Sequence, residues 1–369
     1  MKREKINVGV VGCGNISGIY FKNLTTVFND ILEIYACADL IKEKEDKALS
    51  EYNIPRAMTF EQMTACDKID LILNITQPFN HYDICKKALL AGKHVYVEKP
   101  LSLTFEQGME LIELSKEKKL LLGGAPDTFM GAGIQTCRKL IDDGYIGDIV
   151  GATAFMMSKG HESWHPDPEF YYKPGGGPMF DMGPYYITAL LNLMGGVKTV
   201  TGMNTTAFKE RVITSQPKYM QKILVETPTH VSAMLQFQNG AIASIITTFD
   251  CKKSDLPLIE IYGTKGSIKV PDPNCFSGPV FLATSDGTGY KEIPLTHIYP
   301  DNSRGLGLAD LAKCIITGEI PKAGCQQTGH VLEIMCAVFK SFETGKYYKM
   351  KTRYKRAEPM KRDLIKGQV

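Results

Sequence analysis

A glycine-rich turn between a short apolar run and a helix-like stretch constrains the fold of this chain more than any other feature. The apolar run covers residues 6–12, the turn continues to Ser17, and the helix-like stretch covers about 18–28. Gly12 allows a tight turn, and Gly14 lets the backbone approach a pyrophosphate that the helix N-terminus attracts. This order of strand, turn and helix predicts a dinucleotide-binding unit. The turn residues that we assign to the cofactor are Gly12, Gly14, Asn15 and Ile16.

The second apolar run, residues 32–39, ends in an acid at the place expected for ribose recognition. Asp39 lies roughly 20 residues beyond the glycine turn, where the carboxylate of an NAD-binding unit accepts the ribose hydroxyls. A carboxylate there would repel a 2′-phosphate, so NAD is the expected cofactor. Lys42 and Lys44 keep NADP as the alternative, because lysines also pair with phosphate. A second interpretation is that Asp39 only caps the next helix, expected at 40–52.

Strands continue to alternate with helices up to residue 124, which predicts a parallel, doubly wound sheet. The further strands expected here cover 70–76, 94–97 and 120–124, and the helices cover about 80–91 and 104–118. We therefore expect residues 1–124 to form a dinucleotide-binding Rossmann domain.

The strand at 94–97 ends in Glu98, Lys99 and Pro100, and this triplet is where we expect the chemistry. Ligands of open α/β sheets bind outside the carboxyl ends of the strands. Pro100 stops the strand and biases Lys99 toward an extended conformation, so the lysine side chain is presented at a fixed place. The alternative is a solvated Glu98–Lys99 pair after an edge strand.

After residue 124 the pattern changes to that of a second, α+β domain, residues 125–369. Long β-type runs dominate from residue 197 onward, and Asn239-Gly240 is a hairpin signal. We expect a large, open and mostly antiparallel sheet. Its strands are expected at 147–157, 197–208, 228–238, 241–249, 257–263 and 266–270, with helices at about 131–143, 178–194, 304–317 and 327–344.

The loop expected at 158–176 contains the zinc-protease pattern H-E-x-x-H at 161–165, but its context contradicts a metal site. That motif needs a helix, where both histidines share a face, and here Pro166 follows it. We therefore expect no metal. Trp164 and His165 instead suit stacking on a sugar ring or closing over a cofactor, so both are candidate substrate-binding residues.

The segment 175–185 is the most specific stretch of the second half. Asp181 and Tyr185 are four residues apart, so they would share one face of the expected helix. Pro184 should kink that helix, because it removes a backbone donor and crowds the carbonyl of Phe180. The other interpretation of Tyr185 is a core aromatic residue with a hydrogen-bonded hydroxyl.

The composition is that of a globular enzyme or binding protein kept in a reducing compartment. Hydrophobic residues make up 44% and charged residues 22%, and the net charge of +3 does not indicate a nucleic-acid partner. The ten cysteines include no C-x-x-C pair. We expect no signal peptide and no membrane span, and therefore a cytoplasmic location. The basic run at 349–356 is expected to be a solvated tail.

Four motifs together resemble the Gfo/Idh/MocA family, named after glucose-fructose oxidoreductase, inositol dehydrogenase and rhizopine catabolism. They are the glycine turn, the triplet at 98–100, the segment 175–185 and the hairpin at 261–266. The resemblance spans nearly the whole chain. It implies a Rossmann domain followed by a substrate-binding domain, and assembly into homodimers or higher oligomers.

The resemblance also implies roles for individual residues. Lys99 and Asp181 would surround the reacting carbon, and Tyr185 stands where most members have histidine, as in glucose-fructose oxidoreductase itself. His81 would lie near the nicotinamide, and the Lys99–Pro100 bond would be cis. The cofactor-binding residues implied in this region are Thr76, Pro78, His81, Glu98 and Lys99.

We therefore expect an NAD(H)-dependent oxidoreductase that transfers a hydride between the nicotinamide and a secondary ring hydroxyl. The substrate would be a sugar, a glycoside (for example at its 3-position) or an inositol. The alternatives are an NADP(H)-dependent reductase of another carbonyl or an unsaturated ring, and a nucleotide-binding sugar sensor without turnover.

In the expected mechanism Lys99 and Tyr185 share the substrate proton, and Asp181 orients either this pair or the substrate. Placed together beside the cationic nicotinamide ring, the two groups would have lowered pKa values, because each positive charge lowers the pKa of its neighbours. His165 is the next candidate partner of Lys99. The expected substrate-binding residues are Lys99, Trp164, His165, Asp181 and Tyr185.

Overall fold

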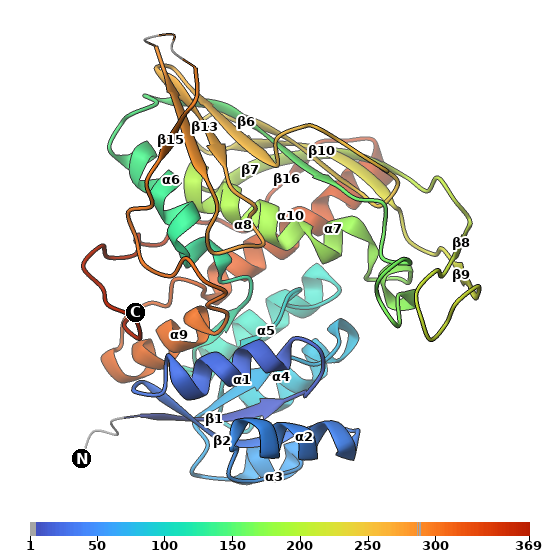
Figure 1. Cartoon of the computed structure of the whole chain (residues 1–369), viewed down its shortest axis with the longest axis vertical. Coiled ribbons are helices and arrows are strands. Elements are labelled where there is room, and N and C mark those ends of the chain that lie inside the picture. Colours follow the sequence, from blue (N-terminus) through green and yellow to red (C-terminus); the bar gives the residue numbers. More distant parts are fainter. Residues whose placement is uncertain (1–4, 286, 288) are drawn as a thin grey trace.

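The computed structural model describes residues 5–285, 287 and 289–369, and Figure 1 shows two β-sheets with helices between them. The N-terminal sheet is parallel, in the order β2-β1-β3-β4-β5. Because β2 and β3 lie on opposite sides of β1, a crevice opens at the carboxyl ends of β1 and β3. This confirms the predicted Rossmann sheet. Its strands are β1 (Ile6–Val11), β2 (Leu32–Ala38), β3 (Leu71–Asn74), β4 (His94–Val97) and β5 (Leu122–Gly124).

Helices connect these strands, and one of them was not predicted. The short helix α3 begins after Thr59, whose side chain accepts from the backbone of Gln62 while the Gln62 side chain accepts from the backbone of Thr59. Such a capping box is visible in a sequence, but six residues are too few for a periodic pattern. The helices here are α1 (Ser17–Thr26), α2 (Lys42–Tyr52), α3 (Phe60–Ala65), α4 (His81–Leu90) and α5 (Phe105–Glu117).

The second sheet has nine strands in the order β15-β14-β13-β12-β6-β11-β10-β7-β16. Among the described strands of this sheet only β6 and β11 pair in parallel, which confirms the predicted, mostly antiparallel sheet. A separate pair of short strands, β8 and β9, projects beyond it (Figure 1). The strands are β6 (Ile149–Met157), β7 (Val197–Thr205), β8 (Glu210–Val212), β9 (Lys222–Leu224), β10 (His230–Phe237), β11 (Ile242–Thr248), β12 (Ile259–Gly263), β13 (Gly266–Val270), β14 (Val280–Thr284), β15 (Lys291–Ile293) and β16 (Tyr348–Lys349).

Helices of the second half fill the space between the sheets (Figure 1). The Gly124 N–H donates to the carbonyl of Ala323, and helices α9 and α10 pack against β5, so the contacts cross the predicted boundary after residue 124. The division into domains 1–124 and 125–369 therefore stays a prediction. Among the described residues, no helix is long and apolar enough to cross a membrane. These helices are α6 (Ala132–Asp142), α7 (Gly177–Asp181), α8 (Gly183–Met194), α9 (Leu306–Thr317) and α10 (Cys325–Thr344).

The helix expected at 178–194 is broken into α7 and α8, with Met182 between them. Pro184 lies at the start of α8, where its missing N–H is harmless. The expected kink is therefore a complete break. Asp181 ends one helix and Tyr185 lies in the first turn of the next.

Candidate active site

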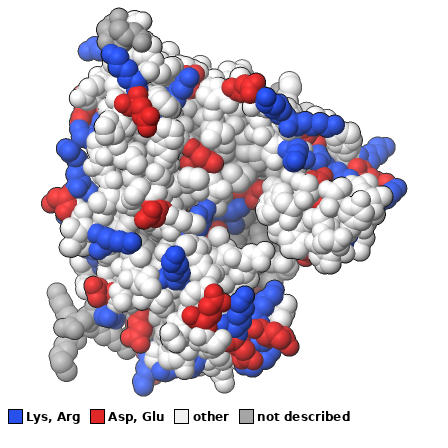
Figure 2. Space-filling model, viewed as in Figure 1, with Lys and Arg blue, Asp and Glu red and all other residues white. Residues whose placement is uncertain are grey.

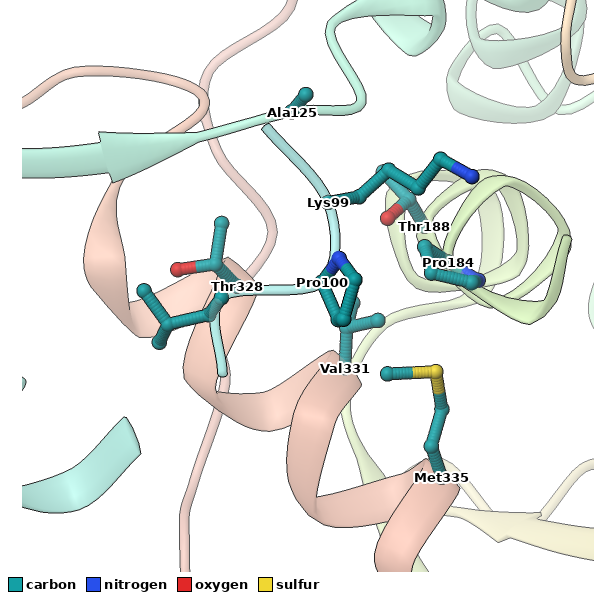
Figure 3. A pocket seen from close by; sticks show the side chains of 9 residues that line it. Lys99, Pro100, Ala125, Pro184, Thr188, Thr328, Val331 and Met335 are labelled. Atoms are coloured by element: carbon teal, nitrogen blue, oxygen red, sulfur yellow. The ribbon is translucent and has the colours of Figure 1, made fainter. Parts of the chain in front are cut away.

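Lys99 leaves the carboxyl end of β4 at the junction of the two halves. The Lys99–Pro100 bond is cis, as the resemblance implied. Figure 3 shows the Pro100 ring between Pro184 of α8 and the α10 side chains of Val331 and Met335. The cavity there measures ≈ 10 Å³, about the space of one water molecule, so it is a packing gap behind the lysine and not a substrate site.

The Lys99 ammonium group is held by a single residue from the other half. Its Nζ donates to Asp181 Oδ1 at 2.9 Å and to the Asp181 carbonyl at 2.7 Å. It also lies 5.3 Å from the centre of the Tyr185 ring. The three residues proposed as catalytic are thus brought together from β4, α7 and α8. Figure 2 shows a hollow near the centre of this face, with basic atoms inside it.

A residue that the sequence analysis did not select completes this group. His161 Nε2 lies 2.9 Å from Asp181 Oδ2, while His161 Nδ1 is buried without a hydrogen-bond partner. His165, which we expected as the next partner of Lys99, instead accepts at Nδ1 from the Asp167 N–H. This bond directs one ring nitrogen of His165 back into its own loop, and the expectation for His165 stays a prediction. The signal for His161 was present in the H-E-x-x-H pattern.

The loop that carries both histidines is irregular at 161–165, which confirms that the pattern is not helical. Trp164 is 61% exposed, whereas the His161 ring packs against Tyr171 at 3.8 Å and Phe249 at 4.7 Å between ring centres. Among the residues that the structure describes, no three His, Cys, Asp or Glu side chains gather as metal ligands would. An exposed indole beside a polar cluster suits contact with a sugar ring.

Burial and charge set the protonation of the central residues. Burial raises the pKa of Asp181, but Lys99 and His161 outweigh it and hold the pKa well below its usual range. Burial disfavours the charge of Lys99, yet the Asp181 carboxylate raises the net pKa of the lysine. Burial also raises the pKa of Tyr185, with a partial lowering by Lys99. The pKa values of Lys99 and Tyr185 are thus both raised in the chain alone, and the lowering expected beside a bound nicotinamide ring stays a prediction.

Two further charged residues behind Tyr185 were also missed. The Arg304 guanidinium interacts electrostatically with the Tyr185 hydroxyl, and one carboxylate oxygen of Asp127 accepts from the Gly305 and Gly307 N–H groups at 2.9 and 3.0 Å. Asp127 is 1% exposed, and burial raises its pKa to about 6. It therefore fixes the start of α9, and with it the backbone next to Arg304.

The glycine turn has the shape that a pyrophosphate requires. Gly12 has φ 106°, and a Cβ atom there would lie 2.8 Å from the Ile75 carbonyl oxygen, so only glycine fits. A Cβ on Gly14 would meet nothing within 4 Å, which leaves open space above the backbone. Asn15 is exposed and Ile16 partly exposed beside it. These residues fit the phosphates of a dinucleotide.

Asp39 lies at the end of β2 beside this turn and is partly exposed. Its Oδ2 accepts from the Cys13 N–H at 2.7 Å, and its Oδ1 accepts from the Ile41 N–H at 2.8 Å. The carboxylate is therefore oriented by the turn on one side and by the start of α2 on the other. Both interpretations of Asp39, ribose recognition and helix capping, are compatible with these bonds.

The residues expected near the nicotinamide mostly form hydrogen bonds that fix the positions of backbone segments. His81 is completely buried, and its ring nitrogens lie 2.6 Å from the Pro100 carbonyl and 3.0 Å from the Thr76 carbonyl. It thereby ties the turn after β3, where Pro78 begins a short 3-10 helix, to the turn after β4. Glu98 is similar: its carboxylate accepts from the Lys99 N–H and from a tyrosine hydroxyl of α1.

Comparisons with known proteins agree with this architecture. A family model described as "Oxidoreductase family, NAD-binding Rossmann fold" matches residues 6–124, and one described as "GFO/IDH/MocA C-terminal domain" matches residues 134–269. Levoglucosan dehydrogenase in complex with NADH superimposes with a TM-score of 0.79 at 21% identity, over 94% of this chain and 100% of that one. An aldose-aldose oxidoreductase from Caulobacter crescentus gives the same values. At this identity the likeness shows the fold.

Curated relatives match over shorter stretches. An uncharacterized oxidoreductase of Schizosaccharomyces pombe is 30% identical over 53% of this chain and 54% of its own length. scyllo-Inositol 2-dehydrogenase (NADP(+)) IolW of Bacillus subtilis is 26% identical over 58% of both chains. D-xylose dehydrogenase of Paenarthrobacter nicotinovorans is 29% identical over 39% of this chain and 38% of its own. The matches thus span about half the length of these relatives.

We predict that Asp127 makes stability depend on pH. Its folded pKa of about 6 lies above the usual value near 3.9, so its contribution is fully present below pH ~3.9 and is lost as the pH rises through 6. Asp127→Asn keeps an oxygen for both N–H donors but cannot ionise. The difference in unfolding free energy, wild type minus Asn variant, should fall by on the order of 2–3 kcal/mol between pH ~4 and ~7 in urea titrations. Parallel profiles, like those expected for the exposed Asp143→Asn control, would contradict this.

Proposed function

Because the chain belongs to the Gfo/Idh/MocA oxidoreductase family, we propose that it is an NAD(H)-dependent oxidoreductase acting on a secondary ring hydroxyl. The substrate class is a sugar, a glycoside or an inositol. The observation that carries the proposal is the Lys99–Asp181 ion pair at 2.9 Å, with Tyr185 beside it at the carboxyl edge of the Rossmann sheet. Supporting it, two of the relatives are named as an inositol dehydrogenase and a xylose dehydrogenase.

Oxidation of the hydroxyl requires the transfer of a hydride from carbon and of a proton from oxygen. A bound nicotinamide would accept the hydride from the ring carbon. The hydroxyl proton would pass to Lys99 or Tyr185, whose pKa values must first fall from their raised values. A positive charge placed beside them lowers both pKa values. Asp181 holds the lysine in place, and Trp164 and His165 line the substrate side from the loop above.

Two alternatives have weaker support. An NADP(H)-dependent reductase of another carbonyl or an unsaturated ring would need a pocket for the 2′-phosphate, close to the Asp39 carboxylate. A sugar sensor that binds nucleotide without turnover would not need the intact set of Lys99, Asp181 and Tyr185. A screen of pyranosides and inositols for NADH formation tests the proposal. Failure of every polyol with both NAD and NADP would overturn it.

Asp39 is predicted to set the preference for NAD, because its charge occupies the place of a 2′-phosphate. In Asp39→Ala the ratio of NADPH to NADH dissociation constants should fall by roughly tenfold, the factor that about 1.4 kcal/mol of repulsion gives. Fluorescence titration of both reduced cofactors measures it. An equal loss of affinity for both cofactors would mean that the variant only loosens the glycine turn, which contains Cys13. Tighter binding of NADPH by the native protein would refute the proposal for Asp39.

Lys99→Ala and Tyr185→Phe should each lower kcat by about 10²- to 10⁴-fold, because general acid–base groups typically contribute that much. Cofactor affinity should change much less. The double variant should be far less impaired than the product of the single effects, since the two residues act as one unit. Tyr185→Phe keeps the ring and removes only the hydroxyl. Full kcat in that variant would identify Tyr185 as a packing residue.

The outer face of the nine-stranded sheet is proposed to bind a second copy of the chain. Met203, Met234 and Ile242 project from neighbouring strands on this face and are 73%, 49% and 47% exposed. Exposed apolar patches of this kind mark association surfaces. Light scattering should give a dimer or a larger assembly, and Met203→Lys with Met234→Lys should lower the mass. Ile320→Lys, at a site elsewhere that is 83% exposed, is the control. A monomeric native protein would exclude the proposal.

A further inference from the structure

The Asp181 carboxylate is divided between two basic groups. Its Oδ1 accepts from Lys99 Nζ and its Oδ2 lies against His161 Nε2, each at 2.9 Å. The three side chains are 18%, 13% and 10% exposed, so water offers little competition for these contacts. In such surroundings each basic neighbour weakens the hold of the carboxylate on the other.

His161 is fixed in this arrangement from several sides. Its ring is packed by Tyr171 and Phe249, and the backbone N–H of His161 donates to the hydroxyl of Tyr172. The neighbouring Glu162 accepts from Arg211 at 2.6 Å, which ties the loop to strand β8. The ring therefore cannot turn away from Asp181 without repacking the loop.

We propose that His161 is a positioning residue that competes with Lys99 for the Asp181 carboxylate and so sets how readily Lys99 gives up its proton. This inference rests on the proposed function, in which Lys99 exchanges a proton with the substrate oxygen. The lysine also faces Glu98, Tyr185 and Tyr171. Besides Asp181, the ionisable groups of its own loop that interact with His161 include Tyr171, Tyr172 and His165.

The direction in which His161 changes the proton affinity of Lys99 can be measured without any substrate. With His161 present, part of the carboxylate charge is directed away from Lys99. Removing the imidazole leaves Asp181 to the lysine alone, which should strengthen the ion pair and keep Lys99 protonated to higher pH. Lys99 would then be a weaker base for the oxidation of a hydroxyl.

The test compares the rate at which acetic anhydride acetylates Lys99 in the full-length chain at pH ~8, read by peptide mass spectrometry against an exposed lysine. The reagent reacts with the unprotonated amine, so His161→Leu should lower the rate by at least about threefold, the change that half a pKa unit produces. His161→Gln keeps a side-chain N–H for Asp181, so its acetylation rate should lie between those of the wild type and His161→Leu. His297→Leu removes an imidazole that contacts Thr296 and not Asp181, so it should match the wild type.

A loosened loop would expose the lysine and raise the rate, so a decrease cannot come from local unfolding. An unchanged or faster rate in His161→Leu overturns the inference. If His161→Leu does not fold, the reciprocal effect of Lys99 on His161 supplies a second measurement. In Lys99→Met, NMR should show the His161 ring holding its proton to higher pH than in the wild type, and no rise overturns the inference. Because neither measurement needs turnover, a failed substrate screen leaves both results readable.

Discussion

The buried ion pair between Lys99 and Asp181 is the interaction on which the site depends, because it is made by two parts of the chain that otherwise form separate sheets. A lysine at the carboxyl end of β4 would be a costly group to bury alone. Asp181 neutralises it and adds a backbone carbonyl as a second acceptor. The pair thus adds a charged contact to the hydrogen bonds and helix packing that hold the second half over the Rossmann sheet.

Further ionisable groups lie around this pair, of which Glu98 and Asp127 are buried and Arg304 is partly exposed. Glu98, Asp127 and Arg304 lie within electrostatic reach of Tyr185 or of each other. Each carboxylate is satisfied by backbone or hydroxyl donors, so the cost of burial is met locally. The site is therefore rigid and of mixed charge, and a small shift in one charge is felt by the others.

The elements that could be predicted from sequence are those with a long, regular pattern. The five Rossmann strands and the glycine turn follow from apolar runs of fixed length and from φ restrictions at positions such as Gly12. The contacts of Asp127 could not be foreseen, because they join segments far apart in the chain: Asp127 and Gly305 are 178 residues apart. The H-E-x-x-H pattern marked His161 but did not show that it faces Asp181. Position relative to Asp181, and not residue type, distinguishes His161 from His165. The positions of the two histidines relative to Asp181 are determined only when the loop folds over α7.

The break between α7 and α8 has a consequence for how the molecule opens. In a continuous helix the Asp181 carbonyl would accept from the Tyr185 N–H, but that N–H donates to Met182 instead. The Lys99 ammonium takes the free carbonyl and acts as a cationic C-cap for α7, donated from the other half of the chain. Any separation of the two halves that releases a bound dinucleotide must uncap this helix. A hydrogen bond to a charged group contributes about 1.5–3 kcal/mol. The strength with which the end of α7 holds the two halves together is therefore set by one lysine.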